Sequence, residues 1–453
     1  MLSVGVAKTE ITPAPGIPMA GYRARVGAAK GVHDPLFARA LALHDGECGL
    51  VLVALDVLSV DEELAGAIRR KAVSRLPGLR DGRLDVIVCA THTHAGPAGI
   101  FSGLEDYDRE LAGRVVRESA KAAVTAWESC RPGRLGLGAC EIQGVACNRA
   151  ESSRGFDPLL RVMKLEDASG EPLACVLNYA CHPTVLGPEN LLFSRDWPGY
   201  TEDIMEASGR PVGMVMFLNG AAADVSTRYT RRASSFDEAE RLGRIVAESA
   251  LHTVDRVEYA STRRISVSCR RLALPRKPPL SPESAYHALE EAEQELANLR
   301  ARADVSPGEI KRAESAVLAW QIVLERSRTR CEGPRTTAAA NGAGPGDVGG
   351  YLAAEVCVVD VQDAIMIFVP GEATARIGER ITQRVSEIKG FSVGRVWFVG
   401  YANGHVGYIV DAEAWGNASF SYETLMSRVA PKAAGLIEEE VANLVVKGMS
   451  DGC

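Results

Sequence analysis

The sequence lacks the local signals of several common protein classes. Its 11 cysteines contain no C-x-x-C pair, which excludes zinc-ribbon and thioredoxin-type sites. No apolar stretch approaches the roughly 18 residues that a membrane span needs. Met1 to Thr12 contains neither the basic and apolar segments nor the cleavage site of a secretion signal. With no export signal and with many cysteines that we expect to be unpaired, we predict a cytoplasmic protein without integral membrane association.

A basic surface and a nucleotide-binding loop are also missing. The formal net charge is −7, from 51 Lys and Arg residues against 58 Asp and Glu residues, which argues against a nucleic-acid partner. No G-x-x-x-x-G-K-[ST] loop is present. Gly344, Gly346 and Gly349 fit G-x-G-x-x-G, but no strand precedes them and no clear helix follows, so we do not expect a dinucleotide site.

The sequence does contain short apolar runs that alternate with amphipathic segments. Hydrophobic residues make up 46% of the 453 residues, enough for a large core. Apolar strands between helices indicate a sheet covered on both faces, and the more alternating residues 134–147 and 257–274 indicate antiparallel strands. We therefore predict an α/β fold with a mixed sheet flanked by helices. The expected strands are residues 49–58, 84–90, 172–181, 212–218, 364–369 and 395–400, and the expected helices are residues 62–76, 107–128, 236–254, 373–388 and 422–446.

Two charged helical stretches interrupt this pattern. Ser281-Pro282-Glu283 and Ser306-Pro307-Gly308-Glu309 each place an N-cap and a proline before an acidic first turn. Two helices joined near residue 304 would form an inserted hairpin, which could be a solvated insertion, a lid or a homo-oligomer contact. The expected boundaries are residues 1–277 and 351–453 for one domain, 278–330 for the hairpin and 331–350 for a flexible connector.

Two histidines directly follow one of the apolar strands. Because residues i and i+2 point to the same side of an extended chain, His92 and His94 can face one site. The carboxyl ends of strands are where open α/β sheets bind ligands. Neutral imidazole is a frequent zinc ligand, so the pair can share ligand and acid–base roles. Two histidines that only cap a strand edge would give the same pattern.

Two further strand ends carry residues of the same kind. His182 follows the apolar run Leu173–Leu177, and Glu372 falls where a buried strand passes into a helix. Each also has a structural explanation, because a lone histidine at a strand end is often structural and the helix dipole favours a carboxylate at a helix start. Two histidines and a glutamate are a known catalytic zinc set that leaves a position for water.

These segments resemble the neutral/alkaline (non-lysosomal) ceramidase family. The most specific marker is residues 91–99, Thr-His-Thr-His-Ala-Gly-Pro-Ala-Gly. The resemblance extends over residues 1–275 and 351–447. The other matching segments are Gly5–Thr12, Met19–Tyr22, Gly31–Ala40, Asn219-Gly220, Ala223–Ser226, Pro370–Glu372 and Gly407–Val410.

The resemblance implies a zinc-dependent amide hydrolase and assigns roles to individual residues. The expected cofactor is Zn²⁺, and the substrate would be ceramide or a more soluble N-acyl compound. The implied zinc ligands are His92, His182, Glu372 and Tyr408. The implied catalytic residues are His94 beside the metal-bound water, Arg149 in contact with the substrate, and Tyr422 in contact with the reacting carbonyl.

The supporting residues and the competing functions follow from this assignment. Asp196 and Asp224 are candidates to orient a ligand histidine, although turn or helix capping would also explain them. His33 is a candidate to line the site. Zinc would lower the pKa of bound water towards ~7, and His94 could carry the proton to the leaving amine. The alternatives are an esterase or lactonase on the same scaffold, or a non-catalytic binding protein.

Overall fold

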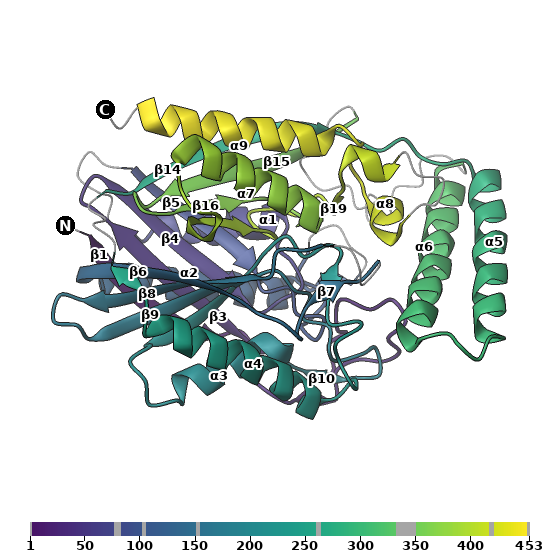
Figure 1. Cartoon of the computed structure of the whole chain (residues 1–453), viewed down its shortest axis with the longest axis horizontal. Coiled ribbons are helices and arrows are strands. Elements are labelled where there is room, and N and C mark those ends of the chain that lie inside the picture. Colours follow the sequence, from purple (N-terminus) through teal and green to yellow (C-terminus); the bar gives the residue numbers. More distant parts are fainter. Residues whose placement is uncertain are drawn as a thin grey trace.

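The structure is a computed structural model that describes residues 2–76, 83–101, 106–150, 155–259, 264–331, 350–415 and 421–450. Two β-sheets pack face to face, and helices cover the outer face of each (Figure 1). The predicted α/β fold, with a mixed sheet flanked by helices and an inserted helical hairpin, is confirmed.

Nine of the described strands form the larger sheet, in the order β11-β9-β8-β6-β1-β3-β4-β5, with β13 beside β6. The β1–β3 and β3–β4 pairs are antiparallel, whereas the β4–β5 and β9–β11 pairs are parallel, so the sheet is mixed. The strands are β1 (Ser3–Glu10), β3 (Phe37–His44), β4 (Cys48–Leu55), β5 (Arg83–Ala90), β6 (Arg131–Glu141), β8 (Leu159–Asp167), β9 (Pro172–Tyr179), β11 (Met214–Asn219) and β13 (Glu258–Tyr259).

The smaller sheet has the order β14-β15-β16-β18. Cys269 and Cys357 are register partners on neighbouring strands and form a disulfide bond. Seven of the described cysteines are free, in line with the expectation that many are unpaired, and the cytoplasmic location inferred from them stays a prediction. The strands are β14 (Ser266–Pro275), β15 (Tyr351–Asp360), β16 (Ile365–Phe368) and β18 (Val396–Val399).

Strand β3 shows why the strands of this sequence are continuous apolar runs. Its residues Ala38, Ala40 and Ala42 lie in the core beneath the helices, whereas Leu41 and Leu43 lie in the core between the two sheets. Successive residues of a strand point to opposite faces, so a strand buried on both faces carries no polar alternation. The small side chains let helix α2 (Arg109–Glu128) lie close to the sheet.

The covering helices begin at the capping residues that their sequences contain. Asp61, Asp108 and Ser235 each accept a hydrogen bond from a main-chain N–H of the first helical turn. Helices α1 (Glu62–Val73), α2, α3 (Asp196–Glu206) and α4 (Phe236–Val254) cover the larger sheet, and α7 (Ala375–Lys389) and α9 (Ala433–Ser450) cover the smaller one. No helix in the described part of the chain is long and apolar enough to cross a membrane.

The predicted final helix over residues 422–446 is wrong in one respect. This segment forms two helices, α8 (Tyr422–Met426) and α9, with Pro431 between them. Proline cannot donate the hydrogen bond that a continuous helix needs, and it disfavours helical backbone in the preceding residue. This break lets α8 turn toward the site while α9 stays on the smaller sheet.

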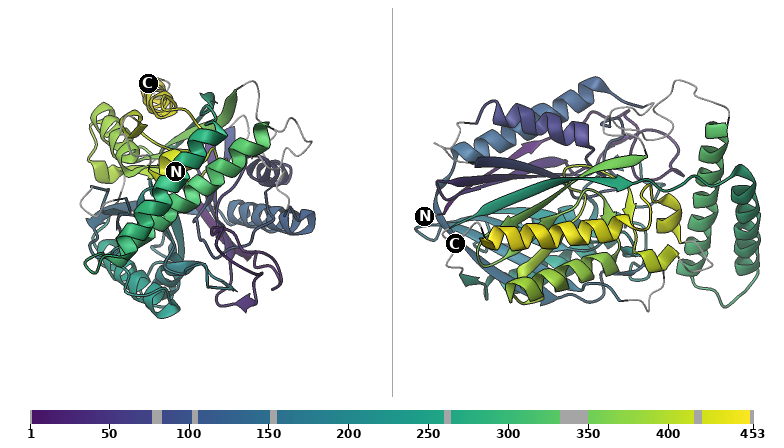
Figure 2. Two further views of the ribbon diagram at one scale, coloured as in Figure 1. Left: turned by 90° about the vertical axis from the view of Figure 1, so that its right-hand side faces the viewer. Right: turned by 90° about the horizontal axis from the view of Figure 1, so that it is seen from above.

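Helices α5 (Pro282–Arg300) and α6 (Pro307–Cys331) form the inserted hairpin. Ser281 accepts a hydrogen bond from the Ser284 N–H, with proline at the first helical position as expected. The hairpin stands at the end of the molecule opposite both termini (Figures 1 and 2). The predicted connector falls mostly on residues 332–349, which lie outside the described residues.

Short two-residue strands connect the loops at the hairpin end of the molecule (Figure 1). They form three pairs, of which the parallel β17–β19 pair matters most for the site. The strands are β2 (Gly31–Val32), β7 (Cys147–Asn148), β10 (Leu192–Phe193), β12 (Val225–Ser226), β17 (Glu372–Ala373) and β19 (Tyr408–Ile409).

Candidate metal centre

His92 begins the loop after β5 and turns its imidazole inward. Its backbone has a φ of 72°, which is rare for a residue with a side chain. The ring Nδ1 lies 2.6 Å from the main-chain oxygen of Leu58, so Nδ1 carries the proton and donates to that oxygen. The free lone pair of Nε2 therefore points into the centre.

His182, in the loop after β9, is held in the same way. Its Nδ1 lies 2.6 Å from the main-chain oxygen of Ala222 and 3.1 Å from that of Val225. Nε2 again presents a lone pair to the centre. Burial lowers the pKa of both His92 and His182 well below the ordinary value, so both rings are neutral at physiological pH.

Glu372 and Tyr408 come from the C-terminal half of the chain and are register partners on β17 and β19. Glu372 Oε2 lies 3.5 Å from His92 Nε2 and 3.4 Å from His182 Nε2. Because burial keeps these rings neutral, neither contact is an ion pair. Glu372 Oε2 is fully buried and accepts no hydrogen bond from the described residues.

These features fit a divalent cation. The buried Glu372 Oε2 accepts no hydrogen bond within the described part of the chain and faces the Nε2 lone pairs of His92 and His182, an arrangement that a cation between these atoms would stabilise. Ligand atoms about 2.0–2.1 Å from a tetrahedral zinc ion are separated from each other by about 3.3 Å, close to the two distances from Glu372 Oε2 to the histidine nitrogens. The residues present therefore fit the expected metal.

His94 lies beside the same point. Its Nε2 is 3.2 Å from His92 Nε2, and one ring nitrogen from each of His92, His94 and His182 lies within 4.8 Å of the other two. Distance alone thus allows His94 as a ligand in place of Glu372. We favour Glu372 because its buried Oε2, which accepts no hydrogen bond from the residues described, lies within 3.5 Å of both His92 Nε2 and His182 Nε2. A Cβ on residue 21 would lie 2.6 Å from His94 Cγ, so Gly21 makes room for this ring.

Arg149, which follows β7, reaches both His182 and Tyr408. Its NH1 lies 3.3 Å from His182 Nε2, and its NH2 donates to the Tyr408 hydroxyl at 3.3 Å. Its Nε donates to Glu423 Oε1 at 2.9 Å, and both side chains of this ion pair are buried. The guanidinium also lies 5.5 Å from the Tyr422 ring centroid. The structure thus brings Arg149 and Tyr422 to the predicted ligands.

Glu423 was not identified from the sequence. An acidic residue in the first turn of a helix has an ordinary explanation in the helix dipole, so only its position directly after Tyr422 could have drawn attention to it. In the structure it is the anionic partner that holds Arg149.

The predicted roles of Asp196 and Asp224 are wrong, because neither carboxylate bonds a ligand histidine. Asp196 accepts main-chain hydrogen bonds from Val185, Leu186 and Trp197 and so holds the loop that follows His182. Asp224 accepts from the Asn148 amide and from the Ala375 N–H. The rings are oriented instead by main-chain oxygens, those of Leu58 for His92 and of Ala222 and Val225 for His182.

His33 does not line the centre either. It is partly exposed, contacts Asp34 Oδ2 at 3.1 Å, and stacks on Phe236 with the ring centroids 3.7 Å apart. These contacts tie the loop after β2 to helix α4, so His33 is a structural residue.

A cavity of about 610 Å³ opens onto the centre. His92, His94, Glu372, Tyr408 and Tyr422 lie on its floor and walls. The cavity extends between α1 on one side and the hairpin with α8 on the other, and it is large enough for a small-molecule substrate.

The comparisons with known proteins agree with this geometry. Residues 2–226 match the family model described as neutral/alkaline non-lysosomal ceramidase, N-terminal. The chain belongs to the neutral/alkaline non-lysosomal ceramidase family. The matched half contains His92, His94, Arg149 and His182, whereas Glu372 and Tyr408 lie beyond it.

Two curated ceramidases show how far the sequence likeness extends. The neutral ceramidase of Mycobacterium tuberculosis is 25% identical over 480 aligned residues, which cover 92% of this chain and 72% of that protein. The neutral ceramidase of Pseudomonas aeruginosa is 28% identical over 231 residues, or 45% of this chain. That alignment spans about a third, 34%, of the Pseudomonas protein.

Solved ceramidase structures share the fold over nearly the whole chain. A structure described as ceramidase complexed with C2 superposes with a TM-score of 0.75 at 20% identity, covering 99% of this chain and 75% of that one. The crystal structure of the Pseudomonas aeruginosa neutral ceramidase superposes with a TM-score of 0.73 at 21% identity, covering 98% and 74%. At 20% and 21% sequence identity, the structural likeness supports the fold assignment alone.

Proposed function

We propose that this ceramidase-family protein is a zinc-dependent amidohydrolase that cleaves an N-acyl bond with metal-activated water. The observation that carries the proposal is that Glu372 Oε2 lies at tetrahedral-edge distances, 3.5 and 3.4 Å, from His92 Nε2 and His182 Nε2. The relatives, which are named as neutral ceramidases, support the amide as the bond that is cleaved.

In this proposal His92, His182, Glu372 and Tyr408 hold the metal. A bound Zn²⁺ lowers the pKa of a water molecule towards ~7 and polarises the amide carbonyl. Burial raises the pKa of the Tyr408 phenol well above its ordinary value, so without a cation this hydroxyl keeps its proton. Tyr408 would therefore bind as a weak neutral ligand or lose its proton on binding.

His94 is the proposed proton carrier. Burial lowers its pKa well below the ordinary value, and the neighbouring His182 and Arg149 add to this effect. The ring is thus neutral and starts the reaction as a base. It takes the proton released when the water oxygen bonds to the carbonyl carbon, and it gives that proton to the amine nitrogen as the C–N bond breaks.

Arg149 and Tyr422 are the proposed donors to the carbonyl oxygen, where negative charge develops. Arg149 is held by Glu423 and so needs little rearrangement when charge appears. Burial raises the pKa of Tyr422, so its hydroxyl stays protonated and available to donate. The products are a carboxylic acid and an amine, from ceramide or from a more soluble N-acyl compound.

Metal analysis and turnover measured on the same samples test this proposal. The wild type is expected to contain about one zinc ion per site and to hydrolyse members of a panel of N-acyl compounds. His92→Ala is expected to lose both, because one of the converging nitrogens is removed. His252→Ala, which changes an exposed histidine on α4, is the matched control and should keep both. Full hydrolysis by a metal-free His92→Ala protein would refute the mechanism.

A further inference from the structure

His94, the proposed proton carrier, lacks the anchor that holds the other two histidines of the centre. His92 and His182 each donate from Nδ1 to a main-chain oxygen. The Nδ1 of His94 is buried and makes no aligned hydrogen bond with any residue that the structure describes. The direction of this ring therefore depends on the main chain that carries it and on the groups packed around it.

A loop near the N-terminus, residues 18–25, packs against His94. The Tyr22 ring lies on the imidazole with the ring centroids 5.0 Å apart, and its hydroxyl donates to the main-chain oxygen of Leu186 at 2.8 Å. Gly21 lies against the same imidazole, since a Cβ there would be 2.6 Å from His94 Cγ. This loop therefore forms one wall of the space that the imidazole occupies.

Arg25 ties this loop to its neighbours through three main-chain oxygens. Its Nη2 donates to the oxygen of His94 itself at 2.8 Å. Its Nη1 donates to the oxygen of Ala20 at 2.7 Å, and its Nε donates to that of Asn190 at 3.1 Å. These oxygens belong to the N-terminal loop, the loop after β5 and the loop before β10. One half-buried side chain thus fixes the main chain of His94 relative to two other segments.

The chemistry of arginine suits this position. The planar guanidinium presents its N–H donors in a fixed fork, whereas lysine has a single nitrogen and no fixed plane. The guanidinium also lies 5.0 Å from the centroid of the Tyr22 ring that packs on His94. Burial lowers the pKa of Arg25 while Tyr22 and Glu189 oppose the shift, and an arginine stays charged at physiological pH. Hydrogen bonds from a charged donor are about twice as strong as neutral ones, so His94 is held firmly.

Firm placement matters because the space around the His94 ring is small. His94 Nε2 lies 3.2 Å from His92 Nε2, and in the proposed reaction it must reach first the water and then the leaving nitrogen. A misplacement of about 1 Å can cost on the order of 100-fold in rate. A looser His94 main chain would thus slow proton transfer without removing a group that binds the metal.

We propose that Arg25 is a positioning residue that holds His94 in place for the transfer of a proton to the leaving group. This inference rests on the proposed amidohydrolase function. An amine leaves with a proton added to its nitrogen as the C–N bond breaks. A p-nitrophenyl ester needs no such proton, because p-nitrophenolate leaves as a stable anion with the electron pair of the C–O bond, and the proton of the water passes to the solvent. Arg25 should therefore matter more for an amide than for such an ester.

A matched amide and ester test the inference on the zinc-loaded protein. N-lauroylethanolamine and p-nitrophenyl laurate share the acyl chain, and any N-acyl compound that the wild type turns over faster can replace the first. Arg25→Ala is expected to lower kcat by about 100-fold for the amide and by about 10-fold or less for the ester, with KM and zinc content unchanged. Methylguanidinium added to Arg25→Ala should restore part of the amide turnover and should not affect the wild type.

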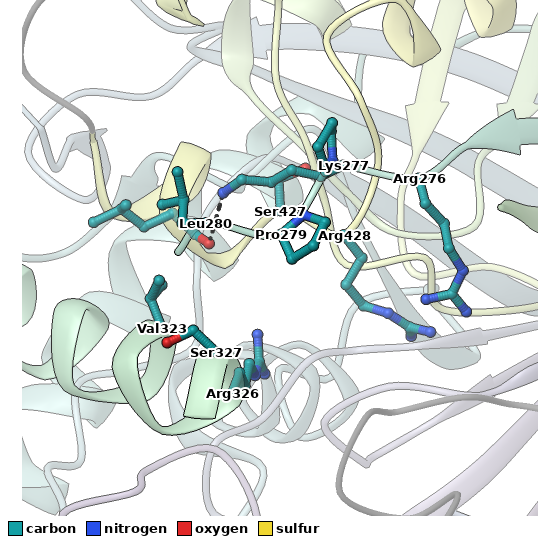
Figure 3. A pocket seen from close by; sticks show the side chains of 11 residues that line it. Arg276, Lys277, Pro279, Leu280, Val323, Arg326, Ser327, Ser427 and Arg428 are labelled. Atoms are coloured by element: carbon teal, nitrogen blue, oxygen red, sulfur yellow. Dashed lines mark hydrogen bonds between the residues drawn. The ribbon is translucent and has the colours of Figure 1, made fainter. Parts of the chain in front are cut away.

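Lys277 provides a contrast, because it holds a different part of the site. It lines a smaller cavity at the root of the hairpin (Figure 3), and its ammonium donates to the main-chain oxygens of Thr424 and Leu425 in α8 at 2.7 and 3.1 Å. Helix α8 carries Tyr422, the proposed donor to a carbonyl oxygen that amide and ester share. Lys277→Met should therefore lower both rates by a similar factor. A ratio of amide to ester turnover that falls as far in Lys277→Met as in Arg25→Ala overturns the inference.

Arg23→Ala is the control in the same loop. Arg23 pairs with Glu325 at the surface and its side chain is 53% exposed, so its removal should leave both rates within about twofold of the wild type. If Arg25→Ala does not fold, Arg25→Lys takes its place and should show a smaller fall in the ratio.

The outcomes separate the inference from the function on which it rests. Wild-type amide turnover in the Arg25 variants, or an equal loss for amide and ester, overturns the inference and leaves the proposed function standing. A wild type that hydrolyses no N-acyl compound overturns both.

Discussion

The orientation of the two buried imidazoles depends on main-chain oxygens. In His92 and His182 the ring Nδ1 donates to oxygens of Leu58 and Ala222, respectively. A metal-binding histidine usually needs such an acceptor, because it fixes which nitrogen faces the metal. Sequence reasoning assigned this task to Asp196 and Asp224, since only side chains can be recognised in a sequence.

The ion pair between Glu423 and Arg149 gives a prediction at the level of one residue. Glu423→Gln keeps the size of the side chain and removes the charge that holds the guanidinium beside His182 and Tyr408. We expect kcat/KM for N-acyl hydrolysis to fall roughly 10- to 100-fold, equivalent to about 1.5–3 kcal/mol, while the zinc content stays unchanged. Kinetics and metal analysis on one preparation measure both.

A matched substitution of a surface glutamate controls for any general effect of removing a carboxylate. Glu413 pairs with Arg376 on the surface and is 69% exposed, so Glu413→Gln should leave kcat/KM within twofold of the wild-type value. If Glu423→Gln hydrolysed substrate as fast as Glu413→Gln, Glu423 would have no role in positioning Arg149.

Individual elements were predictable where the signal is local. The Ser-Pro starts of α5 and α6 and the apolar runs before His92 and His182 predicted the hairpin and the strand ends closely. The broken helix at Pro431 and the Cys269–Cys357 disulfide were missed, because the first depends on how α8 packs and the second on the register of two strands 88 residues apart.

The convergence of the candidate ligands could not follow from the sequence in the same way. His92 and His182 follow β5 and β9, and Glu372 lies on β17, so their meeting depends on strand order and on the packing of two sheets. The family resemblance implied that these three residues share one site, and in the structure Glu372 lies within 3.5 Å of both histidine nitrogens. Their roles as metal ligands stay predictions, as does the use of the hairpin as a homo-oligomer contact.

The attachment of the hairpin to the body gives a prediction at the level of the element. A Cβ on Gly308 near the start of α6 would lie 2.0 Å from Tyr229 Cε1, so Gly308→Ala must push the helix or the ring aside. We expect a loss of about 1–3 kcal/mol in unfolding free energy, with reduced turnover, since α6 also packs on α8. Urea unfolding followed by turnover assays measures the change.

The same substitution elsewhere should act in the opposite direction. A Cβ on Gly435 in α9 would meet no atom within 4 Å, and alanine favours a helix by up to about 1 kcal/mol over glycine. Gly435→Ala is therefore expected to raise stability. A Gly308→Ala protein as stable and active as Gly435→Ala would show that α6 is not anchored on Tyr229.

For the whole molecule, the metal centre connects parts that are far apart in the chain. The candidate ligands come from loops of both sheets, so a bound ion would hold the sheets together at the hairpin end. Removing zinc with a chelator is expected to lower the Tm, because an ion at a thousandfold excess over its Kd stabilises the folded state by roughly 4 kcal/mol. Calorimetry before and after chelation measures the shift.

Restoring the ion is the control for that experiment. Added zinc should return the Tm of the wild type to its starting value and should have no such effect on His182→Ala, which lacks one of the converging nitrogens. An unchanged Tm in wild-type protein that chelation has demonstrably freed of zinc would contradict a centre that joins the two sheets.

The placement of both chain ends opposite the hairpin has a practical consequence (Figures 1 and 2). A tether at either end would attach the protein to a bead or sensor surface by the pole opposite the hairpin. Immobilised protein should therefore keep the hairpin, which contributes Arg326 to the cavity, away from the support, whereas attachment through an engineered cysteine on α5 would turn the hairpin toward the support.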